Sequence, residues 1–204
     1  MDIRELDQQA GVVLGEVVAQ VRADQLWLPT PCPDWTLRGL LRHLVSENEG
    51  FAAAARDGSA PVQVWTGGRL EDDHVGAYRR SSERFAAAFV DGDALDEPMA
   101  VREFGTFPRR VAVSFHLLDN VVHGWDVARA IDAPYDPPAE LVAVALKVAR
   151  LVPTAAETRG PGAAFDQVVP APDAASDLDT LLTLTGRTPS WTSPAIQRIA
   201  RDAG

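Results

Sequence analysis

At 204 residues, the chain is long enough for one domain with a sizeable core. Its formal net charge of −10 and pI near 4.8 argue against nucleic acid and anionic membranes as partners, because both are negatively charged. The sequence contains no apolar run of about 18 residues, so it predicts no transmembrane helix. The single cysteine, Cys32, permits no internal disulfide and is typical of the reducing cytoplasm, where we expect the protein to act.

Apolar residues recur at helical spacing in five stretches, which predict helices at 3–22, 36–56, 71–90, 108–131 and 138–152. Between the first two, the segment LWLPTPCPDW contains three prolines, which force an extended connector at 26–35. Asp34 or Thr36 can cap the second helix, and Gly58 ends it. We expect a loop over 58–70.

The remaining segments predict shorter elements. MAVREFGTFPRRV is typical of two extended pieces around Gly105, a short β-hairpin. In the loop-rich tail we expect a strand at 168–172 and a short helix at 178–187. The sequence therefore predicts a mainly α fold. We expect a helical bundle with a short β-hairpin over 1–153, and a small irregular C-terminal extension over 154–204 packed on the same domain.

A polar stripe runs along the helix expected at 108–131. His116, Asp119 and His123 are spaced i, i+3 and i+7, so they lie over one another on one face, with Asp126 beside them. Apolar residues flank the stripe on both sides, which indicates burial. A metal ion is one of the few partners that satisfies several buried imidazoles and carboxylates at once. The alternative is a hydrogen bond from His123 to Asp119, with His116 at the surface.

The helix expected at 36–56 offers further ligands. His43 and Glu47 lie one turn apart at the edge of its apolar face, and such residues point into the seam between helices, where bundle metal sites are built. His43 can therefore face Asp119 and His123 across the bundle. The alternative is a surface pair of His43 and Glu47 at i and i+4.

Three segments, TPCPDWTLRGLLRHLV (30–45), HLLDNVVHGWDVARA (116–130) and LLTLTGRTPSW (181–191), carry a resemblance to a known family. Together they resemble the actinobacterial proteins related to the metal-binding domain of mycothiol-dependent maleylpyruvate isomerase, in order along nearly the whole chain. The resemblance implies the DinB-like fold, a four-helix bundle with up-down-down-up topology. It also implies a divalent metal held by His43, Asp119 and His123. The isomerase pattern has a glutamate where this chain has Asp119, one methylene shorter.

Two imidazoles and one carboxylate leave coordination positions open, as in catalytic zinc sites, and nickel, iron or manganese can occupy the same set. The resemblance implies that the metal holds mycothiol as a thiolate, which attacks a small-molecule substrate in an isomerase or S-transferase reaction. His116, one turn before Asp119, is the candidate general base or a partner of the ligands. The alternative function is a non-catalytic metal or small-ligand binding protein. A monomer and a homodimer both remain open.

Other residues near these segments have two interpretations. Asp126 either orients His123 or pairs with Arg129 or Arg22. Three arginines before the stripe can receive a substrate carboxylate, or form a solvated cluster: Arg102, Arg109 and Arg110.

Four further residues are not expected to take part in the chemistry. Cys32 lies between prolines with no histidine nearby in sequence, so we expect a small buried connector residue rather than a nucleophile. Trp35 and Trp125 are expected to anchor the two ligand-bearing helices. His74 stands among acidic residues at a helix start and is expected to be solvated.

Overall fold

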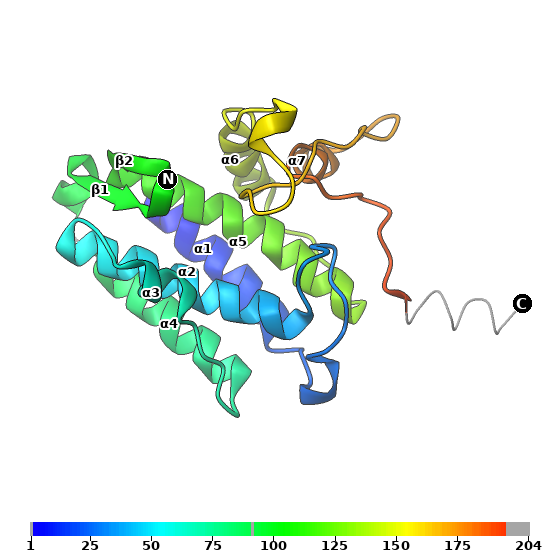
Figure 1. Cartoon of the computed structure of the whole chain (residues 1–204), viewed down its shortest axis with the longest axis horizontal. Coiled ribbons are helices and arrows are strands. Elements are labelled where there is room, and N and C mark those ends of the chain that lie inside the picture. Colours follow the sequence, from blue (N-terminus) through cyan, green and yellow to red (C-terminus); the bar gives the residue numbers. More distant parts are fainter. Residues whose placement is uncertain (1, 91, 195–204) are drawn as a thin grey trace, which may run out of the picture.

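The computed structural model describes residues 2–90 and 92–194, and its architecture is the predicted mainly helical bundle. Four long helices form the bundle: α1 (Ile3–Val18), α2 (Leu37–Asp57), α4 (His74–Ala88) and α5 (Arg109–Ile131). In Figure 1 they lie side by side, with α1 packed mainly on α5 and α2 mainly on α4. Helices α2 and α5 also pack against each other, as their matched apolar stripes predicted.

Local sequence explains where the long helices begin and end. Asp2 caps α1 in a reciprocal pair with Glu5, and Thr36 caps α2 by accepting a hydrogen bond from the Gly39 amide at 3.3 Å. Gly58 ends α2 at a φ of 77°, a left-handed conformation that a residue with a side chain rarely adopts. The predicted cap and stop of α2 are therefore confirmed. The first helix ends at Val18, earlier than predicted.

The hairpin predicted around Gly105 is confirmed. Strands β1 (Pro98–Val101) and β2 (Gly105–Pro108) pair antiparallel, with Met99 opposite Phe107. Four 3-10 segments occur in the described part of the chain: η1 (Ala23–Gln25), η2 (Gly92–Asp96), η3 (Arg102–Phe104) and η4 (Ala156–Thr158). A short helix that the sequence did not predict, α3 (Val62–Thr66), lies in the connection between α2 and α4.

Helix α6 (Ala139–Ala149) packs on α5, and α7 (Asp177–Leu184) packs on α6 at the upper edge of the bundle in Figure 1. Buried Leu181 of α7 joins a core that includes Leu117 of α5 and Leu141 of α6. The predicted strand at 168–172 is wrong. Two of its five residues are prolines without an amide hydrogen, and Val169 donates to the Thr183 carbonyl instead of to a neighbouring strand.

The C-terminal extension was predicted to run to residue 204, and its last ten residues lie outside the described part. None of the described helices is long and apolar enough to cross a membrane.

Candidate metal centre

Helices α2 and α5 bring three polar side chains together where they pack. His43 lies on α2, and Asp119 and His123 lie one turn apart on α5. His43 Nε2 is 3.5 Å from Asp119 Oδ1, and His123 Nε2 is 3.2 Å from the same oxygen. One potential ligand atom from each residue lies within 4.8 Å of the other two. Ligands about 2.1 Å from a tetrahedral ion are roughly 3.4 Å apart, so the two distances to Asp119 already suit a shared cation.

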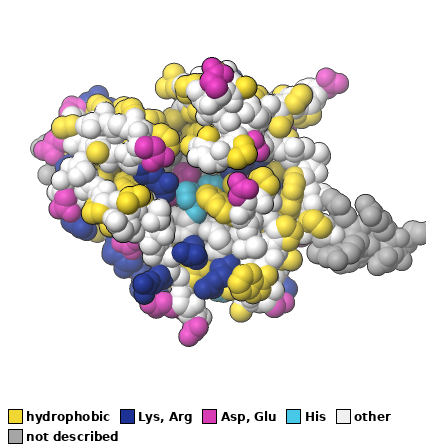
Figure 2. All heavy atoms as spheres, viewed as in Figure 1, with side chains coloured by type: hydrophobic (Ala, Val, Ile, Leu, Met, Phe, Trp, Pro, Cys, Tyr) yellow, Lys and Arg dark blue, Asp and Glu magenta, His cyan; other side chains and the backbone are white. Residues whose placement is uncertain are grey.

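The group is accessible from one side. The side chain of Asp119 is 25 % exposed and that of His43 is 16 % exposed, whereas His123 is nearly buried. Figure 2 shows histidine atoms at the bottom of a hollow on this face of the molecule, with basic and acidic side chains beside them. Trp35 covers the group on another side, because its ring centroid lies 4.5 Å from that of His43 and 5.8 Å from that of His123. A small molecule can therefore approach from solvent while aromatic surface shields the histidines.

Two buried atoms of the group have no hydrogen-bond partner among the described residues: His43 Nε2 and Asp119 Oδ2. Burial lowers the pKa of His43, which favours the neutral imidazole that a metal ligand requires. Burial alone would raise the pKa of Asp119, but the facing His123 and His43 hold it well below its ordinary value. A carboxylate and a neutral imidazole with free lone pairs are the chemistry of a cation site.

His123 is held from behind by a second carboxylate. Its Nδ1 lies 2.8 Å from Asp126 Oδ2, and Arg187 donates to the same oxygen at 2.9 Å. Burial opposes the charged imidazole, but Asp119 and Asp126 together outweigh it and raise the pKa of His123 to about 9. Of the two interpretations of Asp126, orientation of His123 agrees with the structure. Its arginine partner is Arg187, which the sequence did not indicate.

His43 has a similar neighbour on its own helix. Glu47 Oε1 lies 3.6 Å from His43 Nδ1, and the guanidinium of Arg102 contacts the same glutamate oxygen. Glu47 is buried, so the expected alternative of a surface pair is wrong. All three arginines considered as substrate ligands contact a carboxylate in the structure: Arg102 with Glu47, Arg109 with Glu97, and Arg110 with Asp96.

His116 does not join this group, which corrects the expectation that it acts there as a base. Its Nδ1 lies 2.9 Å from Asp7 Oδ1 and its Nε2 lies 2.9 Å from Asn48 Oδ1, so both ring nitrogens are engaged. Its ring stacks on Phe85 with centroids 3.8 Å apart. His116 and His123 do share one face of α5, but seven residues separate them by about 10 Å along the helix axis. One ion cannot span that distance.

The remaining predictions have mixed outcomes. Cys32 is half-buried in its connector, and burial raises the pKa of its thiol to about 11, so it has little thiolate character at neutral pH. His74 was expected to be solvated, and this is wrong, because its Nε2 lies 2.8 Å from the Val21 carbonyl oxygen. Periodicity cannot predict that contact, because the two residues lie on separate segments.

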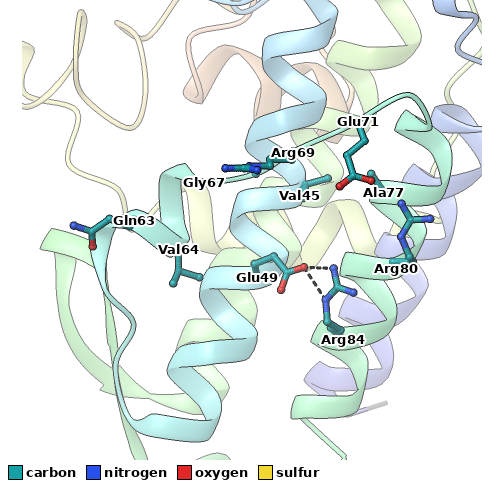
Figure 3. Close-up of a pocket in the computed structure, with 11 residues that line it drawn as sticks. Val45, Glu49, Gln63, Val64, Gly67, Arg69, Glu71, Ala77, Arg80 and Arg84 are labelled. Atoms are coloured by element: carbon teal, nitrogen blue, oxygen red, sulfur yellow. Dashed lines mark hydrogen bonds and ion pairs between the residues drawn. The ribbon is translucent and has the colours of Figure 1, made fainter.

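A cavity of about 370 Å³ lies elsewhere, between α2, α4 and the segment 63–71 (Figure 3). Its wall carries Arg69, Arg80 and Arg84 together with Glu49 and Glu71, and Arg84 pairs with Glu49. None of the three clustered residues lines it. We assign no chemistry to it.

Comparison with known proteins identifies the family of the chain. The family model described as "Mycothiol maleylpyruvate isomerase N-terminal domain" matches residues 8–128, which contain all three clustered residues. Two uncharacterized proteins of Mycobacterium tuberculosis, MT0763 and Rv0738, are each 32% identical over 188 residues, covering 92% of this chain and 99% of theirs.

Two crystal structures share the fold. They are those of the mycothiol-dependent maleylpyruvate isomerase, with a TM-score of 0.60, and of its histidine-to-alanine mutant, with a TM-score of 0.59. Both are 15% identical in sequence, and each match covers 77% of this chain and 68% of the other.

Proposed function

Because this chain belongs to the family of the mycothiol maleylpyruvate isomerase N-terminal domain, we propose that it is a divalent-metal-dependent enzyme that uses a low-molecular-weight thiol. Mycothiol is the proposed thiol, and the proposed reaction is an isomerisation or an S-transfer on a small electrophile in the cytoplasm. One observation carries the proposal. His43, Asp119 and His123 converge, with the side chains of His43 and Asp119 partly exposed to solvent, inside the stretch that the family model matches.

The donor set fits a divalent cation. The proposed ligands are Nε2 of His43, the Asp119 carboxylate and Nε2 of His123, a combination that suits zinc first and also nickel, iron or manganese. The unpartnered His43 Nε2 and Asp119 Oδ2 are the atoms that such a cation would satisfy. When bound, a divalent cation supplies the positive charge that favours the thiolate form of a thiol at neutral pH.

The residues of the chain supply the rest of the site. Asp126 fixes the ring of His123 by accepting its Nδ1–H, which leaves Nε2 facing Asp119. The ring of Trp35 excludes water from one side of both histidines. The exposed edge of Asp119 marks the side from which thiol and substrate enter.

The structure favours this proposal over a closed, non-catalytic metal site. Such a site needs a fourth protein ligand, for which Glu47 and His116 are the two candidates. Glu47 is held by Arg102 beside Nδ1 of His43, on the side away from Asp119. His116 is held by Asp7 and Asn48. With both engaged elsewhere, a cation held by these three residues would keep a coordination position for a thiol.

The test combines metal analysis with a thiol assay on protein purified without chelator. We expect about one zinc per chain, lost in His123→Ala and retained in His74→Ala, a histidine outside the group. We also expect conjugation or isomerisation of some members of a panel of electrophiles and cis-unsaturated acids, with mycothiol as the thiol. Metal binding without turnover across the panel would support the alternative, a non-catalytic binding protein. A wild type that binds no divalent metal at micromolar concentration would refute the metal-dependent enzyme.

A further inference from the structure

Each histidine of the proposed centre is backed by a carboxylate, and each carboxylate by an arginine. On α5 the chain of contacts is His123, Asp126 and Arg187, and all three side chains are buried. Asp126 is fully buried, and Arg187 also donates to the Thr185 carbonyl at 2.7 Å, which fixes the guanidinium in place. The Asp126 carboxylate is thus held between the imidazole of His123 and the guanidinium of Arg187, which pairs with it.

On α2 the corresponding residues are His43, Glu47 and Arg102. Glu47 lies beside Nδ1 of His43, and Arg102 contacts Glu47 and donates to the Trp65 carbonyl at 3.1 Å. The distance between histidine and carboxylate is longer here than on α5, and the arginine is more exposed. The side chain of Arg102 is 24 % exposed, and the distance from Glu47 to His43 is 3.6 Å rather than 2.8 Å.

Neither arginine belongs to the four-helix bundle. Arg102 begins the short 3-10 turn inside the hairpin, and its φ of 45° is an unfavourable backbone conformation for a residue with a side chain. Arg187 follows α7 in the C-terminal extension. The hairpin therefore places one guanidinium on the carboxylate beside His43, and the C-terminal extension places another on the carboxylate beside His123.

We propose that Arg102 and Arg187 are positioning residues that set the charge and the ring orientation of the metal centre. The inference rests on the proposed function. The three carboxylates and two guanidiniums sum to one negative charge, which a divalent cation turns into one positive charge. Without the arginines the loaded centre would carry one negative charge and would repel a thiolate. By accepting the Nδ1–H of His123, Asp126 also leaves Nε2 as the ring nitrogen that would bind the cation.

The test replaces each arginine by methionine, which keeps a long apolar stem without the charge. Arg159→Met is the control for Arg187→Met, because Arg159 is equally buried in the extension but donates to the carbonyls of Pro153, Asp166 and Leu184. Arg84→Met is the control for Arg102→Met, because it removes the surface partner of a different α2 glutamate.

The first measurement is the zinc dissociation constant, obtained by competition with a chromogenic chelator. We expect Arg187→Met to weaken zinc binding by about 10- to 100-fold, as loss of a ligand's supporting partners does elsewhere, and Arg102→Met to weaken it less. Arg187→Lys should recover part of the loss, because it keeps the charge but not the planar fork. The zinc dissociation constants of both control variants should stay within about twofold of the wild-type value. Equal zinc affinity in a variant and its control would overturn the inference.

The second measurement separates charge from structure. Cobalt-loaded protein is titrated with 2-mercaptoethanol, followed by its sulfur-to-cobalt absorption band, and separately with neutral imidazole. Loss of one nearby positive charge should lower the thiol affinity relative to the imidazole affinity by about tenfold. If the ratio of thiol affinity to imidazole affinity is unchanged in both variants, the arginines do not set the charge of the centre.

The outcomes for the inference and for the proposed function are distinct. If Arg187→Met does not fold, Arg187→Lys and Arg102→Met decide the question. A wild type that binds neither zinc nor cobalt overturns the proposed function and this inference together. A wild type that binds both, with variants equal to their controls, overturns the inference alone.

Discussion

Helix α5 carries two histidine clusters two turns apart, and they behave as opposites. Around His116, both ring nitrogens are engaged by Asp7 and Asn48, and the imidazole is only 3 % exposed. Around His123, the neighbouring His43 has a buried nitrogen without a partner, and Asp119 reaches solvent. Both clusters combine histidine with aspartate, so residue type does not distinguish them. Asp7 Oδ2 beside His116 also lacks a hydrogen-bond partner, but Asp7 is fully buried. What distinguishes a candidate metal site is therefore unused coordination capacity next to an opening to solvent.

The hydrogen bonds around His116 also show which ring nitrogen carries a hydrogen. The hydroxyl of Ser81 donates to the Tyr78 carbonyl at 2.8 Å and therefore accepts from the Asn48 amide at 2.9 Å. The other end of that amide, its oxygen, must then face His116, whose Nε2 carries a hydrogen. A nitrogen that already donates cannot bind a metal, so this cluster serves the packing of α1, α2, α4 and α5.

The sharpest way to break the comparison is His116→Ala. Loss of the imidazole leaves Asp7 buried without its main partner, which should reduce the free energy of unfolding by about 3–5 kcal/mol. Zinc stoichiometry should stay at the wild-type value, because no proposed ligand changes. Urea unfolding checks the loss of stability, and metal analysis of the same preparation checks the zinc stoichiometry. Loss of zinc from folded His116→Ala protein would show that the two clusters are not independent.

The converse variant is His123→Ala. It removes a proposed ligand, so zinc affinity should fall by about 100-fold or more, since losing a ligand costs more than losing its supporting partner. The metal-free variant should remain folded, as judged by its circular dichroism spectrum. The prediction fails if chelator competition gives the same zinc affinity for wild type and variant.

The pH dependence of stability sharpens the difference further. The pKa of His123 is raised in the folded metal-free protein, so the stability that this group contributes is complete below about pH 6.5 and is lost as the pH rises toward about 9. The expected loss is on the order of 3 kcal/mol. Zinc binding should strengthen over the same range, because the cation displaces that proton. Urea unfolding of metal-free wild type and His123→Gln at several pH values checks this. The free energy of unfolding of His123→Gln should not show this decrease between about pH 6.5 and 9.

The smallest effect is expected for Asp119→Glu. The side chain lies at the open edge of the group, so one additional methylene has room and the carboxylate is retained. Zinc affinity should stay within about tenfold of wild type, a limit we set below the effect of losing a ligand. Asp119→Asn, which has the same length without the charge, should bind zinc more weakly than Asp119→Glu. The reverse order would indicate that Asp119 is not a ligand.

Much of this architecture was predictable from sequence. Helical periodicity and the positions of Thr36, Gly58 and Gly105 fixed the bundle, a cap, a helix stop and the hairpin, because these signals act within a few residues. The stripe on α5 gave Asp119 and His123 as neighbours one turn apart. His43 followed from its place at the edge of the apolar face of α2 and from the family resemblance.

Sequence reasoning failed where distance along a helix or contacts between distant segments decide the structure. The stripe argument treats angle around a helix and ignores distance along it, so it placed His116 with His123. Arg187 contacts Asp126 across 61 residues of sequence, and periodicity carries no information at that range. The pairing of Arg102 with Glu47 has the same character, since the two lie on different elements 55 residues apart. Long-range ion pairs require the fold before they can be identified.

The position of Arg187 near the end of the described chain has a consequence for the order of assembly. The four bundle helices are complete by Ile131, so during synthesis they can pack before Arg187 leaves the ribosome. Until then Asp126 lacks its guanidinium partner, and burying it alone would be costly. We therefore expect the nascent bundle to keep this end of α5 hydrated, and to close it only when the segment after α7 docks. The bundle would then form before water leaves the surroundings of Asp126 behind His123, so the centre is completed late in folding.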